Sequence, residues 1–401
     1  MSGRWHILDG GLRHEVGHSL EQARSLVGAL ARRGIAATVY THAQADRGLL
    51  EGVPAVPLFR TDPQSYEFGD DVAGELEDFV LINTITRNDL DRLDRAAVGP
   101  EDVAFFSTVT MNQLLAIVQW ADAFEPGRGP KIVLRLLMPP RWSPMERAVS
   151  RPGVYYRYAW RTRRRDRATR LFLGVETEAM ARAYEPLFDS RPAVLPMIAE
   201  LPAGTSAEAG AALAGRQEGE SLICYLGNAR TERGFALLPE IVARGRVAAG
   251  RLRYFIQCDR DAATAFGEIE RQLAACPEVT LHRGQLDAQH YFSLLQAADL
   301  ALVPYHPLRY RVRGSGVYAE ASLAGAPVIV PAATWMAEEV EREGNGAVFA
   351  DFSAAAVAAA IGAALPRLAE LRAAARRHGE KQRSRHGTDA FIDFVDRLGQ
   401  G

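Results

Sequence analysis

Short apolar segments rich in valine, isoleucine and leucine alternate with longer segments of helical periodicity along almost the whole chain. In the first half, the segments that read as buried strands are residues 6–8, 36–40, 79–83, 103–107, 131–135 and 170–174. In the second half they are residues 221–227, 252–257, 279–284, 300–304 and 327–331. Strands that alternate with helices form a parallel sheet with crossover connections, so the predicted fold class is α/β.

The middle of the chain interrupts this pattern. Residues 196–220 are rich in glycine, alanine, proline and serine, contain no strand pattern and have weak helical periodicity. This composition is typical of a linker, and 401 residues exceed the length of one ordinary domain. We therefore predict an N-terminal domain (1–197), a linker (198–219), a second domain (220–380) and a C-terminal helix (381–401) that packs back onto the first domain.

Charge and cysteine content exclude several classes of protein. The 47 basic and 49 acidic residues nearly balance, so the surface as a whole is not expected to bind nucleic acid. Cys224, Cys258 and Cys276 lack the spacing of a disulfide framework or a zinc site. The N-terminus has no apolar signal-peptide segment, and the alanine-rich run 354–365 is too short to span a bilayer. We expect a soluble, cytoplasmic protein.

The first chemical signal follows the first strand of the second domain, in the sequence YLGNARTERGF (225–235). Gly227 permits a tight turn at the carboxyl end of that strand, where open α/β sheets bind ligands. Asn228, Arg230 and Arg233 follow in the same loop. Two arginines suit a phosphate group. A solvated basic loop is the alternative interpretation.

The second signal is RVRGSGVYAEASLAGAPVIVP (311–331), in which small residues open a predicted helix. The free backbone N–H groups of Ser315, Gly316 and Val317 would face an anion. Glu320 follows one helical turn later, and a carboxylate there can accept both hydrogen bonds of a ribose diol. The alternative is that Glu320 only interacts with the helix dipole.

Together, and in this order, the two segments resemble the nucleotide-sugar-binding domain of GT-B glycosyltransferases, particularly the family-4-like group (glycosyltransferase group 1). Arg233 stands where that family has a lysine, and Asn228 where it has an arginine. Glu320 matches the second glutamate of the family's two-glutamate motif, while the first falls on Val312. Three further residues match the family's base-binding loop, namely Gly284, Gln285 and Leu286.

The resemblance implies two Rossmann-like domains that face each other across a cleft. It implies transfer of a sugar from a nucleoside-diphosphate sugar to a saccharide or lipid-linked acceptor, as in polysaccharide biosynthesis. Arg233 and Arg230 would stabilise the departing diphosphate, and the nucleotide sugar would be a substrate, so no cofactor is expected. No DxD metal motif occurs in a suitable loop, and we expect chemistry without a metal ion.

The N-terminal half is less specific. Its first loop and helix resemble the glycine-rich loop of the same family. His18, at the predicted helix start, is a candidate contact to the acceptor or the donor phosphate. Asp9, at the end of the first strand, is a candidate base. Residues at helix starts and strand ends also have purely structural roles, which is the alternative for both.

Residues 151–170 hold eight arginines against one aspartate, interleaved with tyrosines and a tryptophan. Such a segment can bind an anionic membrane surface. It can also be a solvated helix face whose arginine stems cover the sheet.

Two other functions compete with glycosyl transfer. A nucleotide-sugar epimerase or a phosphorylase can use the same two-domain fold. A phosphorylase is disfavoured because the only lysines, Lys131 and Lys381, lie outside the second-domain motifs. A non-catalytic protein that binds the nucleotide sugar or a membrane partner is the other alternative, since Val312 replaces a family glutamate.

Overall fold

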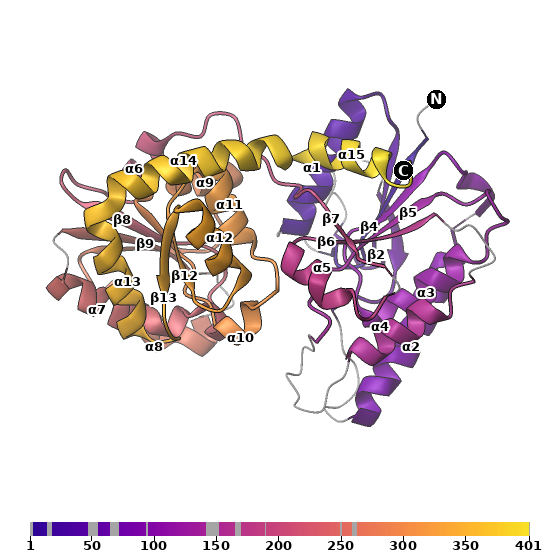
Figure 1. The fold of residues 1–401 in the computed structure, drawn as a ribbon, viewed down its shortest axis with the longest axis horizontal. Coiled ribbons are helices and arrows are strands. Elements are labelled where there is room, and N and C mark those ends of the chain that lie inside the picture. Colours follow the sequence, from indigo (N-terminus) through magenta and orange to yellow (C-terminus); the bar gives the residue numbers. More distant parts are fainter. Residues whose placement is uncertain are drawn as a thin grey trace. The chain divides into compact units, whose positions relative to one another are not determined.

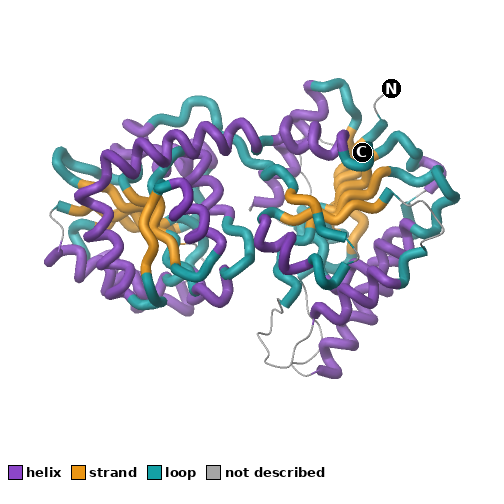
Figure 2. Tube along the Cα trace, in the orientation of Figure 1, coloured by secondary structure: helices purple, strands orange, loops and turns teal. Residues whose placement is uncertain are grey.

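The computed structural model describes residues 3–13, 18–46, 55–64, 72–93, 95–141, 152–164, 170–188, 190–248, 251–258 and 263–400. The chain divides into two compact units (Figure 1). The first unit contains residues 1–198 and 386–401, and the second contains residues 199–385. Each unit is built around one parallel β-sheet with helices packed on it (Figure 2). The predicted α/β class is therefore confirmed.

The first unit has a seven-stranded sheet in the order β3-β2-β1-β4-β5-β6-β7. Its strands are β1 Trp5–Leu8, β2 Ala37–His42, β3 Ala55–Phe59, β4 Val103–Phe106, β5 Lys131–Arg135, β6 Leu171–Val175 and β7 Ala193–Val194. Its helices are α1 His18–Arg32, α2 Val72–Leu90, α3 Met111–Ala121, α4 Pro152–Arg161, α5 Glu178–Tyr184 and α15 Thr388–Arg397, with a short 3-10 turn η1 Arg95–Ala97.

Alternating side chains of β4 show which helices cover the two faces of this sheet. Phe105 packs against Phe391 of α15, with ring centroids 4.9 Å apart, in a core that also contains Leu20 of α1. Phe106 points to the opposite face and meets Trp120 of α3 at 6.1 Å. Helices α2, α3 and α4 lie together on that second side (Figure 1). The predicted return of the C-terminal helix to the first unit is confirmed by α15.

One predicted strand is wrong: residues 79–83 lie in the middle of helix α2. The apolar run fits either structure by composition, but tertiary packing decides for the helix. Asn83 donates from Nδ2 to the carbonyl oxygen of Phe79, one helical turn earlier, and accepts from the backbone N–H of Ala116 in α3. Three strands escaped prediction, namely β3, β7 and β13 (Gly346–Phe349), and all are edge strands.

The second unit has a six-stranded sheet in the order β10-β9-β8-β11-β12-β13. Its other strands are β8 Ser221–Tyr225, β9 Leu252–Cys258, β10 Val279–Arg283, β11 Leu300–Leu302 and β12 Val328–Pro331. Its helices are α6 Ala207–Leu213, α7 Leu238–Ala248, α8 Ala263–Ala274, α9 Ala288–Ala297, α10 Pro307–Tyr310, α11 Gly316–Ala324, α12 Trp335–Glu343, α13 Ala354–Ala364 and α14 Leu368–Arg385. Three 3-10 turns complete it, η2 Thr231–Arg233, η3 Phe235–Leu237 and η5 Leu365–Arg367.

Two features of this unit were not visible in the sequence. The segment 198–219 carries helix α6, which starts at the capping residue Ser206 and packs on α9. Residues 354–385 also form a nearly continuous helical stretch that is long and apolar enough, by length and composition alone, to cross a membrane. Val357, Ile361 and Leu371 of that stretch are buried in the core of the second unit, which accounts for its apolar character.

Candidate nucleotide-sugar site

The loop after β8 turns at Gly227, whose φ of +99° is a conformation that residues with a side chain rarely adopt. A Cβ atom at this position would lie 3.2 Å from Nη1 of Arg233 and 3.2 Å from Cγ2 of Val317. The absence of a side chain thus lets three segments approach one another: the loop after β8, the turn η2 and the first residues of α11. These segments contain most of the site residues predicted in the second domain.

Arg233 is held by two tyrosines. Its Nε donates to the hydroxyl of Tyr310 at 3.4 Å, and its guanidinium carbon lies 5.7 Å from the ring centroid of Tyr305. Burial lowers the pKa of Arg233, the neighbouring phenol groups raise it, and the net shift is upward. The side chain is therefore a fixed cation at every working pH.

Arg230 and Asn228 occupy more open positions in the same loop. Arg230 is half-exposed, and its guanidinium lies 3.8 Å from the carboxylate of Glu232. Asn228 is partly buried. Because Arg230 already has a carboxylate neighbour, Arg233 is the better-positioned of the two arginines to bind an anion beside Gly227.

Gln257, at the end of β9, joins the loop after β8 to the loop after β10. Its Oε1 accepts from the backbone N–H of Gly227 at 2.9 Å, and its Nε2 donates to the carbonyl oxygen of Gly284 at 3.0 Å. Gln285 is exposed beside Gly284, and Leu286 packs on the core. Sequence reasoning missed Gln257, although a polar residue in the apolar segment 252–257 is a signal that a buried amide has a partner.

The start of α11 is an ordered helix N-terminus. Ser315 caps it, and its hydroxyl accepts from the backbone N–H of Tyr318 at 3.2 Å. Gly316 and Val317 follow as the first helical residues, whose N–H groups have no partner within the helix itself. This end of α11 can therefore hold an anion next to Arg233.

Glu320 lies one turn into α11 and is only 8% exposed. Its Oε2 accepts from the hydroxyl of Tyr291 in α9 at 2.6 Å. Burial, and then the adjacent Glu320 carboxylate, raise the pKa of Tyr291 well above its usual value, so the phenol stays protonated and donates. Tyr291 thus fixes one carboxylate oxygen, a role that was not predicted from the sequence.

Asp9 lies in the first unit, at the end of β1, and is buried. Its carboxylate accepts from the backbone N–H of Gly11 at 2.9 Å, and burial raises its pKa. A small cavity of about 10 Å³ beside it is lined by Gln22, Ser107 and Arg135, among others. Arg135, not predicted from the sequence, donates to Ser107 and Gln22 and is the buried cation of this cluster.

His18 is the first residue of α1. Its side chain lies outside the described part of the chain. Among the described residues, no group of three or more histidine, cysteine, aspartate or glutamate side chains has the arrangement of a metal site. The three cysteines are free thiols.

No protein-family model and no curated protein matches the sequence. The two α/β units nevertheless define the GT-B glycosyltransferase fold, which the sequence predicted. The sucrose-phosphate synthase of Thermosynechococcus elongatus has this fold, with a TM-score of 0.68 and 15% identity over 99% of this chain and 98% of that one. WaaG, a glycosyltransferase involved in lipopolysaccharide biosynthesis, aligns with a TM-score of 0.62 and 17% identity over 99% and 100% of the two chains. HepE from Anabaena, solved with UDP and glucose, aligns with a TM-score of 0.66 and 14% identity over the full length of both chains.

Proposed function

We propose that this protein is a glycosyltransferase that moves a sugar from a nucleoside-diphosphate sugar to a saccharide or lipid-linked acceptor, without a metal ion. The observation that carries the proposal is the close approach of Gly227, Arg233 and Val317, which sets a fixed cation beside a helix N-terminus. The GT-B fold supports it, because HepE of the same fold was solved with UDP and glucose.

In the proposed reaction, the bond between the anomeric carbon and the diphosphate oxygen breaks, and its electron pair stays on the diphosphate. The acceptor oxygen forms the new bond to the anomeric carbon and gives up its proton to a base. Negative charge develops on the departing diphosphate, so a cation fixed before the reaction lowers the barrier. Arg233 and the N–H groups of Gly316 and Val317 would supply this stabilisation, with Arg230 contributing from the edge of the loop.

Glu320 is proposed to bind the ribose. Tyr291 donates to Oε2, and a carboxylate has about four lone-pair sites, so a group of this kind can accept from several hydroxyls at once. Gly284, Gln285 and Leu286 are proposed to lie beside the base, and Gly227 and Asn228 beside the diphosphate. Gln257 would act as a positioning residue, because it fixes the backbone of two of these loops.

For the acceptor, we retain Asp9 as the proposed base and His18 as a proposed contact. Burial raises the pKa of Asp9, which brings the carboxylate closer to the range in which it exchanges protons with a substrate. We also propose a cytoplasmic location, where reducing conditions suit a chain with three free thiols.

Titration calorimetry with UDP and GDP tests the binding half of this proposal. The wild-type chain should bind one of the two nucleotides, and Glu320→Ala should weaken that binding. The matched control is Glu240→Ala, which removes an exposed carboxylate that pairs with Arg244 on α7. Absence of binding to either nucleotide, or equal affinity in all three proteins, would refute the proposed site.

A lipid-linked acceptor would require contact with a membrane, and we propose that helices α2 and α4 provide it. Seven large hydrophobic residues are exposed in the described part of the chain, and five of them lie on these two helices. They are Val72, Leu76, Val80, Val154 and Tyr158, each at least 50% exposed. We call these five residues the α2–α4 apolar surface. Phe79 of α2 joins the helices through ring contacts with Tyr155 and Tyr158 at 4.7 and 6.2 Å.

Helix α2 has polar and apolar residues on both its buried and its exposed sides. It buries Glu75 and Asp78 while exposing Leu76 and Val80. On α4, Arg157 and Arg161 are exposed beside Tyr158, so cations border the apolar side chains. Segments that lie in the interface of an anionic bilayer typically have apolar side chains bordered by basic residues. Residues 151 and 165–169 of the predicted arginine-rich segment lie outside the described residues.

A further inference from the structure

A second group of arginines lies immediately before α11. Residues 309–313 read RYRVR, with Arg309, Arg311 and Arg313 at alternate positions and no acidic side chain among them. The guanidinium carbon of Arg313 lies 5.4 Å from the ring centroid of Tyr310. The hydroxyl of the same Tyr310 accepts from Nε of Arg233. Tyr310 therefore contacts both Arg233, in the loop after β8, and Arg313, just before helix α11.

This second group is held in place by α12. The indole Nε1 of Trp335 donates to the carbonyl oxygen of Arg313 at 2.7 Å, and the backbone N–H of Trp335 donates to the carbonyl oxygen of Arg311 at 3.2 Å. The indole also packs edge-on against Tyr318 of α11, with centroids 5.1 Å apart. The backbone that carries the two guanidinium groups is thus fixed at two points before any ligand binds.

The surroundings of Arg313 are rich in positive charge. Burial, and then the nearby Arg313, lower the pKa of Arg309, as expected when two cations face each other. Of the neighbouring carboxylates, Glu232 lies beside Arg230, and Glu320 accepts from Tyr291. Within the described residues, neither Arg311 nor Arg313 forms an ion pair. Clustered cations of this kind repel one another unless an anion binds among them.

The chemistry of a guanidinium narrows the choice of anion. Arginine only donates hydrogen bonds and matches a carboxylate in a two-point geometry, whereas a neutral sugar is best bound by side chains that can also accept from its hydroxyls. The diphosphate is already provided with Arg233 and the start of α11. A further anion that stays next to the diphosphate is most simply one carried by the sugar attached to it.

We propose that the donor sugar carries a carboxylate, as in a uronic acid, and that Arg313, assisted by Arg311, binds it. This inference rests on the proposed function, since it names the class of donor for the same site. In this proposal, Arg311 and Arg313, on either side of Val312, select the donor sugar and do not bind the diphosphate.

The test is titration calorimetry with three probes for each base: the nucleoside diphosphate, the neutral donor and the acidic donor. The sets are UDP, UDP-glucose and UDP-glucuronate, and GDP, GDP-mannose and GDP-mannuronate. For the base that binds, the wild-type chain should prefer the acidic donor by about tenfold, as one charge-assisted hydrogen-bonded pair provides. Arg313→Gln should abolish this preference and leave the affinity for the bare diphosphate unchanged.

Arg244→Gln is the matched control, because it removes an exposed guanidinium that pairs with Glu240 on α7. It should retain the preference for the acidic donor. Equal affinity of the wild-type chain for neutral and acidic donors would overturn the inference while leaving the nucleotide site intact. An Arg313→Gln variant that loses bare-diphosphate affinity as strongly as acidic-donor affinity would also overturn it. Failure of every probe, bare diphosphates included, would instead refute the proposed function itself.

Discussion

Gly227 and Arg233 approach so closely that a methyl group on residue 227 would lie 3.2 Å from Nη1 of the arginine. Five residues lie between them in the chain, and the turn η2 brings the guanidinium back toward the glycine. The position of the cation therefore depends on a backbone that has no side chain at that point.

This contact predicts the effect of Gly227→Ala. The added methyl group should displace the Arg233 side chain and weaken binding of the nucleoside diphosphate. Gly219→Ala is the control, because Gly219 also has a positive φ, +77°, but has open space where the Cβ would be. Both variants should lose about 1–2 kcal/mol of stability from backbone strain. Calorimetry should show weakened nucleotide binding in Gly227→Ala alone, and equal affinity in the two variants would argue against the contact.

The hydrogen bond between Tyr291 and Glu320 predicts a graded series. Glu320→Ala should weaken nucleotide binding most, and Glu320→Gln less, because the amide keeps one acceptor oxygen. Tyr291→Phe should have the smallest effect, since it removes the donor that orients the carboxylate and leaves both oxygens in place. Dissociation constants for the three variants provide the comparison. A Tyr291→Phe variant that binds more weakly than Glu320→Ala would show that the tyrosine, rather than the glutamate, contacts the nucleotide.

Much of this arrangement could be predicted from the sequence, because it follows from chain order. Parallel strands end at the same edge of a sheet, so loops that follow β8 and β11 have to meet there. This is why Gly227, Arg233 and Val317 could be assigned to one site. The start of helix α11 at Gly316 could be predicted, because a serine followed by glycine before an apolar segment is typical of a helix N-cap.

What could not be predicted depends on contacts between distant segments. Residues 79–83 have the composition of a strand, and only their packing against α3 makes them helical. Gln257 and Tyr291 gain their roles from partners 27 to 30 residues away. Arg313 gains its position from Trp335 and Tyr310. No local pattern specifies such pairs.

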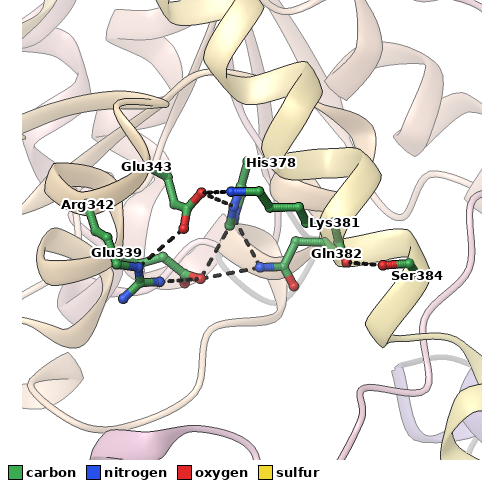
Figure 3. Close-up of polar contacts among 7 residues, drawn as sticks. All are labelled: Glu339, Arg342, Glu343, His378, Lys381, Gln382 and Ser384. Carbon is green, nitrogen blue, oxygen red and sulfur yellow. Dashed lines mark hydrogen bonds and ion pairs between the residues drawn. The ribbon is translucent and has the colours of Figure 1, made fainter.

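A buried histidine between α12 and α14 predicts how stability depends on pH (Figure 3). His378 lies 3.8 Å from the carboxylate of Glu339 and 3.6 Å from that of Glu343, with Lys381 and Gln382 beside it on its own helix. Burial lowers the pKa of His378 below 6.5, so the folded unit holds it neutral. The free energy of unfolding should therefore fall as the pH drops below about 6.5, where the unfolded chain binds the proton more readily.

Urea unfolding at pH 7.5 and pH 5.5 measures this effect. The wild-type chain should lose more stability between the two values than His378→Gln, which has no titrating group at that position. Hydrogen bonding to Lys381 lowers the pKa of Glu343 to about 2, so that carboxylate contributes stability that is lost only below about pH 4.5. Identical pH dependence of the two proteins above pH 5 would rule out His378 as the responsible group.

The α2–α4 apolar surface predicts two separable contributions to membrane binding. Replacing Leu76 and Val80 together by serine should reduce sedimentation with anionic vesicles at every salt concentration. Replacing Arg157 and Arg161 by glutamine should weaken the free energy of vesicle binding by about 1 kcal/mol for each arginine. This loss should be seen mainly at low salt, because salt screens exposed charges. Leu308→Ser is the control and should have no effect, because Leu308 is the most exposed large hydrophobic residue in the described part of the second unit. Wild-type protein that stays in the supernatant with every vesicle would exclude this surface as a membrane contact.

Glycosyl transfer is tested most directly by measuring the release of nucleoside diphosphate from a panel of nucleotide sugars, with saccharide and lipid-linked acceptors supplied. The wild-type chain should release the diphosphate of one donor, and sugar should appear on one acceptor class. Arg233→Ala should raise the activation free energy of that turnover by about 2–4 kcal/mol and so slow it. The unfolding midpoint of the variant should change little. Turnover that is equal in both proteins, or nucleotide binding with no turnover of any donor, would contradict glycosyl transfer driven by Arg233.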